Sequence, residues 1–344
     1  VLEDGLIRPD ENFCNVLKGA MKHFRVRAKK AVFTVNSGRI ANREITIPLV
    51  KENKIRGLLL ANSSEYFPVD FEKHQMVYRI MEKVDTKEDK HYKLSVLAVP
   101  NDLIKSYEKF AADCNLTIMA MDYVGNSIGQ VMKKTIRDDS VILIKVDETS
   151  SMLTVMKNGE VDLQRNISYG IEEAVETMMS TNVYGEQLSY ADALQIMRRR
   201  TCIRKHLDVE MGYREEEDES PDIARAREEI TEALRMLIGN IGRVLDYYLS
   251  RNTDADIRHI KLIGLGADCS GLSKLMTNEL GIKVTSLQEF PEINMNRIMQ
   301  DGSFKIAEYV TCIGASFAPM NFRFGDRKDG ASEEEESLFL PGLV

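Results

Sequence analysis

The segment Asp147–Ser151 places two carboxylates, three hydroxyl groups and several backbone amides between two predicted strands. An aspartate at the end of a strand, followed by hydroxyls and amides, can bind a phosphate through a divalent cation. Because aspartate, serine and threonine also favour ordinary turns, a polar turn without a ligand remains the alternative. The segment is therefore a candidate site for a metal-bound phosphate.

A second candidate site lies in Gly264-Leu265-Gly266, which follows a predicted strand and precedes Gly271 and a predicted helix. Glycines there let a ligand approach the backbone, and a helix N-terminus favours anions. The spacing is not that of a dinucleotide-binding fingerprint, since the third glycine comes five residues after the second. A tight strand-to-helix turn is the alternative, and no Walker A motif is present.

Two other patterns are weaker candidates for catalysis or metal binding. Gly125–Gly129 matches the G-x-S-x-G nucleophile elbow of hydrolases, whose catalytic histidine follows the end of a later strand. His206 and His259 do not follow strand ends, so a helix that begins with glycine residues is the favoured interpretation. Cys202 and His206 are one helical turn apart, yet two ligands do not make a zinc site. The five cysteines have no C-x-x-C spacing, which indicates reduced thiols in a cytosol.

Length and composition bound the class of protein. The 344 residues correspond to roughly two domains, and 43% hydrophobic residues indicate a globular chain. The net charge of −8 argues against a general nucleic-acid binder and against attachment to anionic lipid by charge alone. No apolar run is long enough to span a bilayer, and no signal-peptide pattern opens the chain.

The first half of the chain alternates helical and strand patterns. A helix is expected over about 10–24, with Asp10 as its N-cap. The apolar face expected to point inward on this helix is Phe13, Val16, Leu17, Ala20, Met21 and Phe24. The other expected elements are strands at 31–35, 40–47, 71–81, 94–99 and 116–121, helices near 51–66, after 102 and near 123–134, and a charged loop at 84–91.

The second half opens with three predicted strands at 141–147, 152–157 and 161–167. Asn158-Gly159 is a strong hairpin signal, because both turn positions need positive φ. One long helix is expected over 222–251, where Gly239 and Gly242 would mark close packing. The other expected elements are a strand at 257–263 and helices near 170–180, 189–200, 272–280 and 306–317. This alternation predicts an α/β chain in two lobes.

The order of several segments resembles the type IV pilus assembly protein PilM family, whose actin-like fold is related to that of the division protein FtsA. The resemblance covers about residues 5–320. Thr149 stands where the family's phosphate loop has glycine, and Leu265 replaces the middle glycine of its adenosine loop. The segments that carry the resemblance are Lys30–Pro48, Glu65–Pro68, Leu94–Pro100 with the helix to Phe110, Val141–Tyr169, Arg243–Arg251 and Ile263–Leu272.

The resemblance implies an α/β, actin-like (ribonuclease H-like) two-lobed fold. The first lobe would span residues 1–137 and contain a small inserted α/β subdomain at about 25–91. The second lobe would span residues 138–324, followed by an acidic, flexible tail at 325–344. The family's N-terminal strands are missing from this chain, which begins at Val1, so we expect upstream residues in the natural protein.

The resemblance also implies a function: a cytoplasmic scaffold of type IV pilus assembly, peripheral at the inner face of the cytoplasmic membrane. The inserted subdomain would bind the short cytoplasmic N-terminal peptide of a PilN-like membrane protein. Other pilus assembly proteins are expected partners, whereas binding to nucleic acid and direct insertion into the membrane are not expected. Self-association is left open. An FtsA-like division or filament-forming ATPase is the alternative. The implied partner-binding residues are Val35, Ile45, Ile47, Leu59, Tyr66 and Phe67.

Bound ATP with Mg²⁺ is compatible with the resemblance, but no catalytic residue is assigned and hydrolysis is not implied. Asp147 would be the metal ligand. In the tail, the apolar residues Leu338–Pro341 follow Glu333–Glu336 and resemble the partner peptide, so the tail is expected to compete for the same groove. The nucleotide-binding residues implied are Asp147, Thr149, Ser150, Ser151, Gly170, Gly264 and Gly266.

Overall fold

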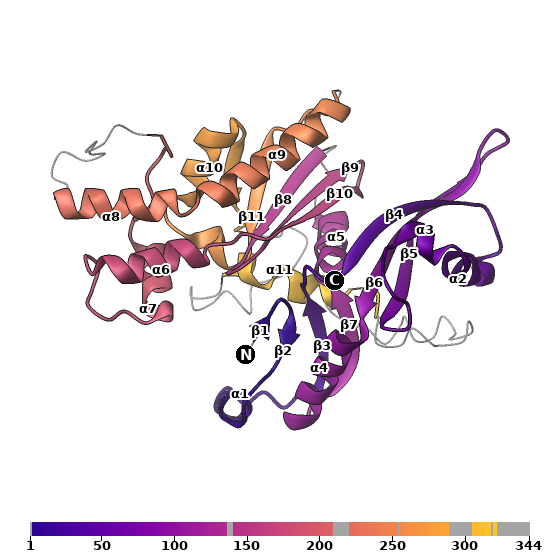
Figure 1. Ribbon diagram of the computed structural model, residues 1–344, viewed down its shortest axis with the longest axis horizontal. Coiled ribbons are helices and arrows are strands. Elements are labelled where there is room, and N and C mark those ends of the chain that lie inside the picture. The colour runs from indigo at the N-terminus through magenta and orange to yellow at the C-terminus, as the bar shows by residue number, and fades with distance from the viewer. Residues whose placement is uncertain are drawn as a thin grey trace. The chain divides into compact units, whose positions relative to one another are not determined.

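The computed structural model describes residues 2–135, 140–208, 220–253, 255–288, 305–317 and 319–321 (Figure 1). Contacts between residues divide the chain into two compact units. Unit 1 comprises Val1–Gln130 and Thr311–Leu343, and unit 2 comprises Val131–Val310. The predicted docking segment Leu338–Pro341 lies outside the described residues.

Unit 1 contains a pair of parallel strands, β3 (Lys30–Val35) and β7 (Thr117–Tyr123). A small apolar cluster joins this pair to two helices: Cys14, Phe110 and Cys114 are buried, with Phe13 and Phe33 packed against them. A short hairpin at residues 2–7 was not predicted. The other elements of this part are β1 (Leu2–Glu3), β2 (Leu6–Ile7), α1 (Glu11–His23) and α4 (Asn101–Asp113). Two further helices, α5 (Val124–Thr135) and α11 (Ile306–Ala315), contain residues of both units.

Helix α1 confirms one prediction and corrects another. Asp10 caps it as expected, with its carboxylate accepting a hydrogen bond from the Phe13 amide at 2.7 Å. The predicted inward face is wrong at Val16 and Phe24, which are 62% and 75% exposed. Phe24 follows the last helical residue, so helical periodicity no longer sets the direction of its side chain.

Unit 1 also contains a three-stranded antiparallel sheet in the order β4-β6-β5, and this sheet with the helices α2 and α3 is called the subdomain below. Ile45 pairs with Leu94 and Ile47 with Tyr92, and these residues share one core with residues of the helices. The predicted charged loop is shorter than expected, because the strands continue pairing to Asp85 and Lys90. The elements are β4 (Ala41–Pro48), α2 (Glu52–Ala61), α3 (Ser63–Tyr66), β5 (His74–Asp85) and β6 (Lys90–Pro100).

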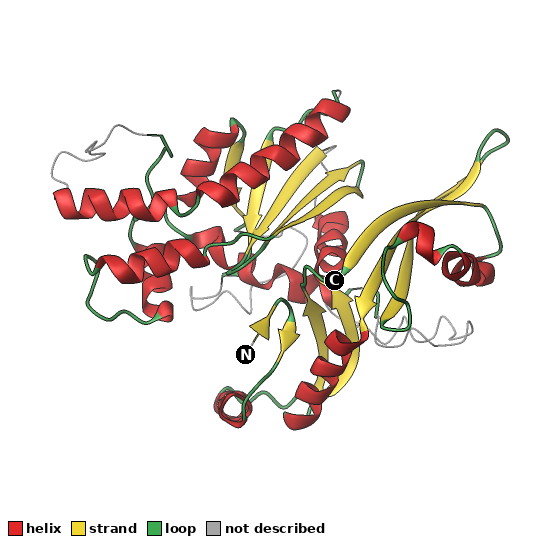
Figure 2. Ribbon diagram, in the orientation of Figure 1, coloured by secondary structure: helices red, strands yellow, loops and turns green. Residues whose placement is uncertain are grey.

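Unit 2 is built on a five-stranded sheet in the order β10-β9-β8-β11-β12 (Figure 2). The three predicted consecutive strands are confirmed as an antiparallel run, and β8, β11 and β12 are parallel. Asn158 and Gly159 have φ of 53° and 76°, as the hairpin prediction requires. The strands are β8 (Ser140–Val146), β9 (Ser151–Lys157), β10 (Glu160–Ile167), β11 (His259–Ile263) and β12 (Lys283–Ser286).

The helices of unit 2 pack on this sheet in one large apolar core. The single long helix that we predicted is wrong: the chain breaks near Ala233 and Leu234 into two helices. Gly239 has no neighbouring atom within 4 Å of an added Cβ, so close packing does not explain it, whereas Gly242 faces Leu280. The helices are α6 (Glu172–Thr181), α7 (Tyr190–Arg199), α8 (Pro221–Glu232), α9 (Arg235–Arg251) and α10 (Leu272–Leu280).

Candidate functional site

The hairpin turn, defined here as residues 147–150 between β8 and β9, is the structural counterpart of the predicted phosphate site. The Asp147 amide donates to the Ser150 carbonyl at 3.0 Å and closes the turn. The parallel pairing of β8 with β11 brings the turn beside the second glycine motif, where the Leu265 amide lies 3.5 Å from the Asp147 carboxylate. The two predicted motifs therefore meet at one edge of the sheet.

Lys145 is the residue at this site that sequence reasoning missed. Its side chain is largely buried, and its ammonium group forms an ion pair with the Asp147 carboxylate. The signal was present as a single lysine inside the otherwise apolar strand sequence VILIKV. A buried charge needs a partner of opposite sign, and here the Asp147 carboxylate of the same chain is that partner. The Asp147 carboxylate is therefore already neutralised without a bound cation.

The N-terminus of α6 is occupied by the hairpin turn. The backbone amides of Ile171 and Glu172 donate to the carbonyls of Asp147 and Glu148 at 3.0 and 2.9 Å. An added Cβ at Gly170 would lie 2.1 Å from the Glu148 carbonyl oxygen, so glycine is needed for this contact. Amides at a helix N-terminus are the groups that would bind a phosphate. In this structure two of them are used inside the protein.

The glycines of the second motif also pack against β8. Gly264 has φ of +86°, and an added Cβ would lie 2.7 Å from both the Val146 carbonyl and the Asp147 carboxylate. At Gly266 an added Cβ would lie 2.8 Å from the Val146 side chain. These internal contacts explain both glycines without a ligand.

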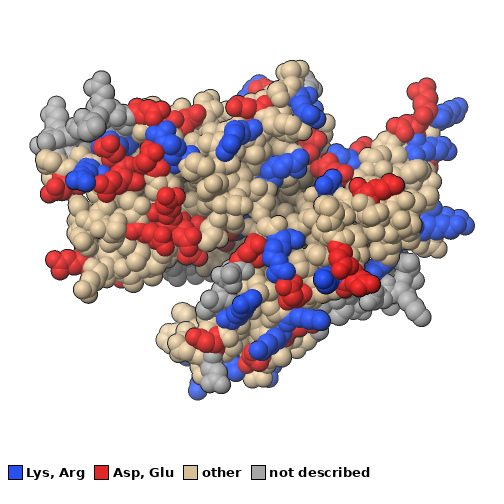
Figure 3. Space-filling view, in the orientation of Figure 1, with Lys and Arg blue, Asp and Glu red and all other residues tan. Residues whose placement is uncertain are grey.

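The side chains around the hairpin turn are acidic. Burial and the nearby carboxylates of Glu176 and Glu148 raise the pKa of Glu172. Burial and the charge of Glu148 likewise raise the pKa of Tyr190. Figure 3 shows acidic side chains gathered over α6. Such a group of like charges repels a phosphate chain.

The hydroxyl residues of the predicted phosphate site have different surroundings. Ser151 is buried, and its hydroxyl donates to the Tyr169 carbonyl at 2.8 Å. Thr149 is exposed, and Ser150 supplies the carbonyl that closes the turn. Among the residues that the structure describes, no group of three or more His, Cys, Asp or Glu could hold a metal ion.

The residues of unit 2 therefore do not fit Mg-ATP as arranged. The metal ligand proposed from sequence is paired with Lys145, two of the helix amides are used by carbonyls, and Glu148 adds negative charge. A magnesium–phosphate complex would have to displace the lysine and open the turn. The arrangement instead locks β8, α6 and the loop after β11 together.

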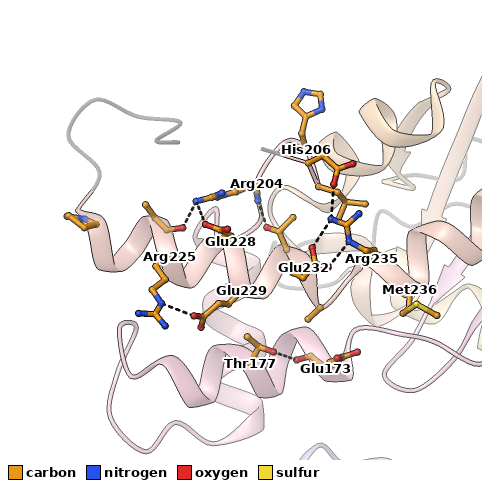
Figure 4. Close-up of a pocket in the computed structure, with 16 residues that line it drawn as sticks. Glu173, Thr177, Arg204, His206, Arg225, Glu228, Glu229, Glu232, Arg235 and Met236 are labelled. Carbon is orange, nitrogen blue, oxygen red and sulfur yellow. Dashed lines mark hydrogen bonds and ion pairs between the residues drawn. The ribbon is translucent and has the colours of Figure 1, made fainter. Parts of the chain in front are cut away.

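A hollow of about 1500 Å³ lies along α8 and faces α6 (Figure 4). Its charged side chains pair with one another: Arg225 with Glu229 at 3.0 Å, and Arg235 with Glu232 at 2.6 Å. The buried Arg204 donates to the Ala224 carbonyl at 2.7 Å. The Arg204 contact joins α8 to the segment before it, and the two ion pairs lie within α8 and between α8 and α9, which indicates a structural network.

The weak catalytic and zinc patterns are explained by packing. Ser127 is buried in α5 and donates to the Asp122 carboxylate at 2.5 Å, so its hydroxyl is not the exposed nucleophile of an elbow. Burial raises the pKa of Asp122, which also accepts from the Met320 amide at 2.8 Å. Burial raises the pKa of Cys202 as well, and His206 lies 3.6 Å from the Glu279 carboxylate.

The six predicted partner-binding residues lie in unit 1, but five of them are buried. Tyr66 alone among the six is partly exposed. Leu58, Phe71 and Tyr78 are likewise partly buried around the same core. Side chains of the core can shape a groove, but a peptide would touch these partly exposed ones. The five buried residues are Val35, Ile45, Ile47, Leu59 and Phe67.

Comparison with known proteins bears on the fold. No family model matches the chain, and no curated protein matches it in sequence. A solved structure described as a PilM–PilN type IV pilus biogenesis complex matches with a TM-score of 0.70. The match covers 91% of this chain and 86% of that chain at 14% sequence identity. The chain has the actin-like fold. The similarity to PilM that the sequence motifs predicted is thereby confirmed for the fold.

Other solved structures are more distant. MreB5 of Spiroplasma citri bound to ADP has a TM-score of 0.45 and 10% identity, covering 91% of this chain and 76% of that chain. The ethanolamine utilization protein EutJ from Carboxydothermus hydrogenoformans has a TM-score of 0.37 and 10% identity, covering 63% and 60%. Within the described ranges, no helix has the length and apolar character needed to cross a membrane.

Proposed function

We propose that this protein is a cytoplasmic scaffold of type IV pilus assembly that binds the short N-terminal peptide of a PilN-like membrane protein. The observation that carries the proposal is the similarity to PilM in the PilM–PilN complex, which extends over 91% of the chain. The subdomain and both units contribute to a match of that extent. Association with the inner face of the membrane would then follow from the partner.

The proposed binding surface is the part of unit 1 formed by residues 32–47 and 58–67. Strand β4 is an edge strand of the subdomain sheet, and β6 is its neighbour on one side. An extended peptide can add to such an edge through backbone hydrogen bonds, while apolar pockets select its side chains. Tyr66 supports this location because its aromatic ring is partly exposed next to the subdomain core.

The test is the affinity of the fluorophore-labelled cytoplasmic peptide of the PilN-like protein from the same organism, measured by fluorescence anisotropy. We expect Tyr66→Ala to raise Kd at least tenfold, because truncating an aromatic anchor typically costs about 2 kcal/mol or more. Tyr247→Ala is the matched control, since Tyr247 is 47% exposed on α9 of unit 2. Absence of binding by the unchanged protein would overturn the function, and equal Kd values for both variants would overturn the surface.

Variants of the buried residues are unsuitable for this test. Leu59 and Phe67 are 0% and 1% exposed, and their truncation to alanine would cost about 2–5 kcal/mol of stability. A loss of peptide binding would then report unfolding of the subdomain. Tyr66→Ala avoids this confusion, provided that its urea unfolding curve stays close to that of the unchanged protein.

ATP and Mg²⁺ are not part of this proposal. The Asp147 carboxylate is paired with Lys145, and the amides of Ile171 and Glu172 are occupied. The FtsA-like ATPase alternative needs a nucleotide bound at this turn, and the geometry of unit 2 does not favour it.

A further inference from the structure

The end of α1 and the segment after it form a basic surface in unit 1. We define this basic tip as residues 18–30, which contain six lysines and arginines and no aspartate or glutamate. Every residue from Lys22 to Lys30 is exposed. Within the described part of the chain, none of the six basic side chains forms an ion pair. The six are Lys18, Lys22, Arg25, Arg27, Lys29 and Lys30.

The backbone holds the basic tip in a defined turn. The Val26 amide donates to the Met21 carbonyl at 2.8 Å, and the Arg25 amide donates to the Lys22 carbonyl at 3.1 Å. This pair of bonds is a Schellman motif, with Arg25 at φ of 55° in the position that usually holds glycine. The backbone of the turn is therefore ordered before any ligand binds, and it holds the Cα positions of the basic residues in place.

Two apolar side chains stand among these charges. Phe24 is 75% exposed and Val26 is 49% exposed, although helical periodicity predicted that Phe24 would face the core. A helix C-terminus attracts cations through its dipole, which accounts for Lys22 and Arg25. It does not account for an exposed phenylalanine, nor for the basic residues beyond the turn.

A groove of about 690 Å³ runs beside the turn. Five of the six basic residues line it, together with Met21, Val26 and the residues Cys114–Leu116. No acidic residue is among the described residues that line the groove, and Asp113, whose charge acts on Cys114, is exposed. The excess of positive charge and the size of the groove suit a phosphate-bearing headgroup.

We propose that the basic tip is a docking surface for a bilayer containing anionic phospholipid. The lysines and arginines would contact headgroup phosphates, while Phe24 and Val26 enter the interfacial region. Charge and an apolar group together give stable peripheral binding where either alone is marginal. The net charge of −8 averages over the whole chain and hides this local excess. The exposed phenylalanine favours lipid over nucleic acid, whose phosphates need only the basic residues.

The experiment is co-sedimentation of the full chain with vesicles of phosphatidylcholine alone or with about one third phosphatidylglycerol. We expect binding to the anionic vesicles only, weakening as salt rises. Each basic residue near an anionic surface contributes about fivefold to affinity. Reversing two charges in Lys22→Glu/Arg27→Glu should therefore weaken binding at least about twentyfold. The matched control is Lys51→Glu/Lys54→Glu, which makes the same charge change at two exposed lysines of unit 1.

The apolar contribution has its own readout. Phe24→Ser should weaken vesicle binding roughly fivefold, while Met236→Ser, at another exposed apolar residue, should not. Because the chain contains no tryptophan, Phe24→Trp gives a single reporter. Its emission should move to shorter wavelength with anionic vesicles and be quenched by brominated lipid.

Three outcomes would overturn the proposal. These are equal binding to neutral and anionic vesicles, equal affinity of the reversed and control variants, and binding to a DNA duplex without binding to vesicles. The vesicles contain no partner peptide, so this result is independent of the peptide test of the proposed function.

Discussion

The hairpin turn of unit 2 and the basic tip of unit 1 both concentrate charge, but they neutralise it differently. At the hairpin turn, Lys145 pairs with Asp147 and the carbonyls of the turn take the amides of α6. At the basic tip, six basic residues within the described structure have no acidic partner and surround an exposed phenylalanine. Paired, buried charge holds elements of one protein together, whereas unpaired, exposed charge is left for another molecule.

The largest expected effect concerns the buried ion pair. Asp147→Asn leaves the Lys145 charge buried without its partner, and we expect a loss of about 3 kcal/mol in the free energy of unfolding. The double variant Lys145→Met/Asp147→Asn should recover much of this loss, because neither charge then remains buried. Urea unfolding at neutral pH measures both values. Additive losses in the double variant would contradict the structural reading of the pair.

A second prediction concerns the glycines of unit 2. Gly170→Ala places a Cβ 2.1 Å from a carbonyl oxygen, so we expect a cost of about 2 kcal/mol in unfolding free energy. Gly239→Ala, in α9 with open space at the Cβ position, should instead stabilise by about 0.5–1 kcal/mol. If close packing is what requires glycine at position 170, chemical unfolding should show a lower free energy of unfolding for Gly170→Ala and a higher one for Gly239→Ala. A tolerated Gly170→Ala would weaken the conclusion that the hairpin turn is locked.

The smallest expected signal is a calorimetric titration of Mg-ATP. We expect no saturable heat for the unchanged protein, because the groups that would hold phosphate and metal are used internally. The same titration on Glu148→Gln tests whether like-charge repulsion is the main obstacle. Saturable binding that Asp147→Ala abolishes would show that the turn opens for a nucleotide, and would favour the ATPase alternative.

Much of the fold could be predicted because local signals agreed with it. Asn158-Gly159 produced the hairpin, Asp10 capped α1, and alternating apolar strands predicted β8 to β10. The break near Leu234 was missed, since its residues keep a helical apolar period across it. Strand β12 was also missed, because four residues of mixed polarity carry little periodicity.

The sequence predicted where the candidate site lies, but not whether its groups are free to bind a ligand. Sequence pattern selected Asp147, Gly170 and Gly264, and the structure brings them together. Whether glycines next to an aspartate surround a ligand or their own backbone depends on distances that spacing does not encode. The ion pair of Lys145 with Asp147 shows that the protein itself uses this carboxylate. The pair could not be predicted from spacing, because it depends on how β8 leads into the turn.

By itself, the sequence determined the order of most helices and strands, the hairpin at Asn158-Gly159 and the similarity to PilM, because these depend on local periodicity and turn chemistry. Only the tertiary structure decided which charges are paired. Lys145 in its ion pair and the lysines of the basic tip carry the same ammonium group. Their difference comes from burial, since a charge removed from water must find a partner and an exposed one need not.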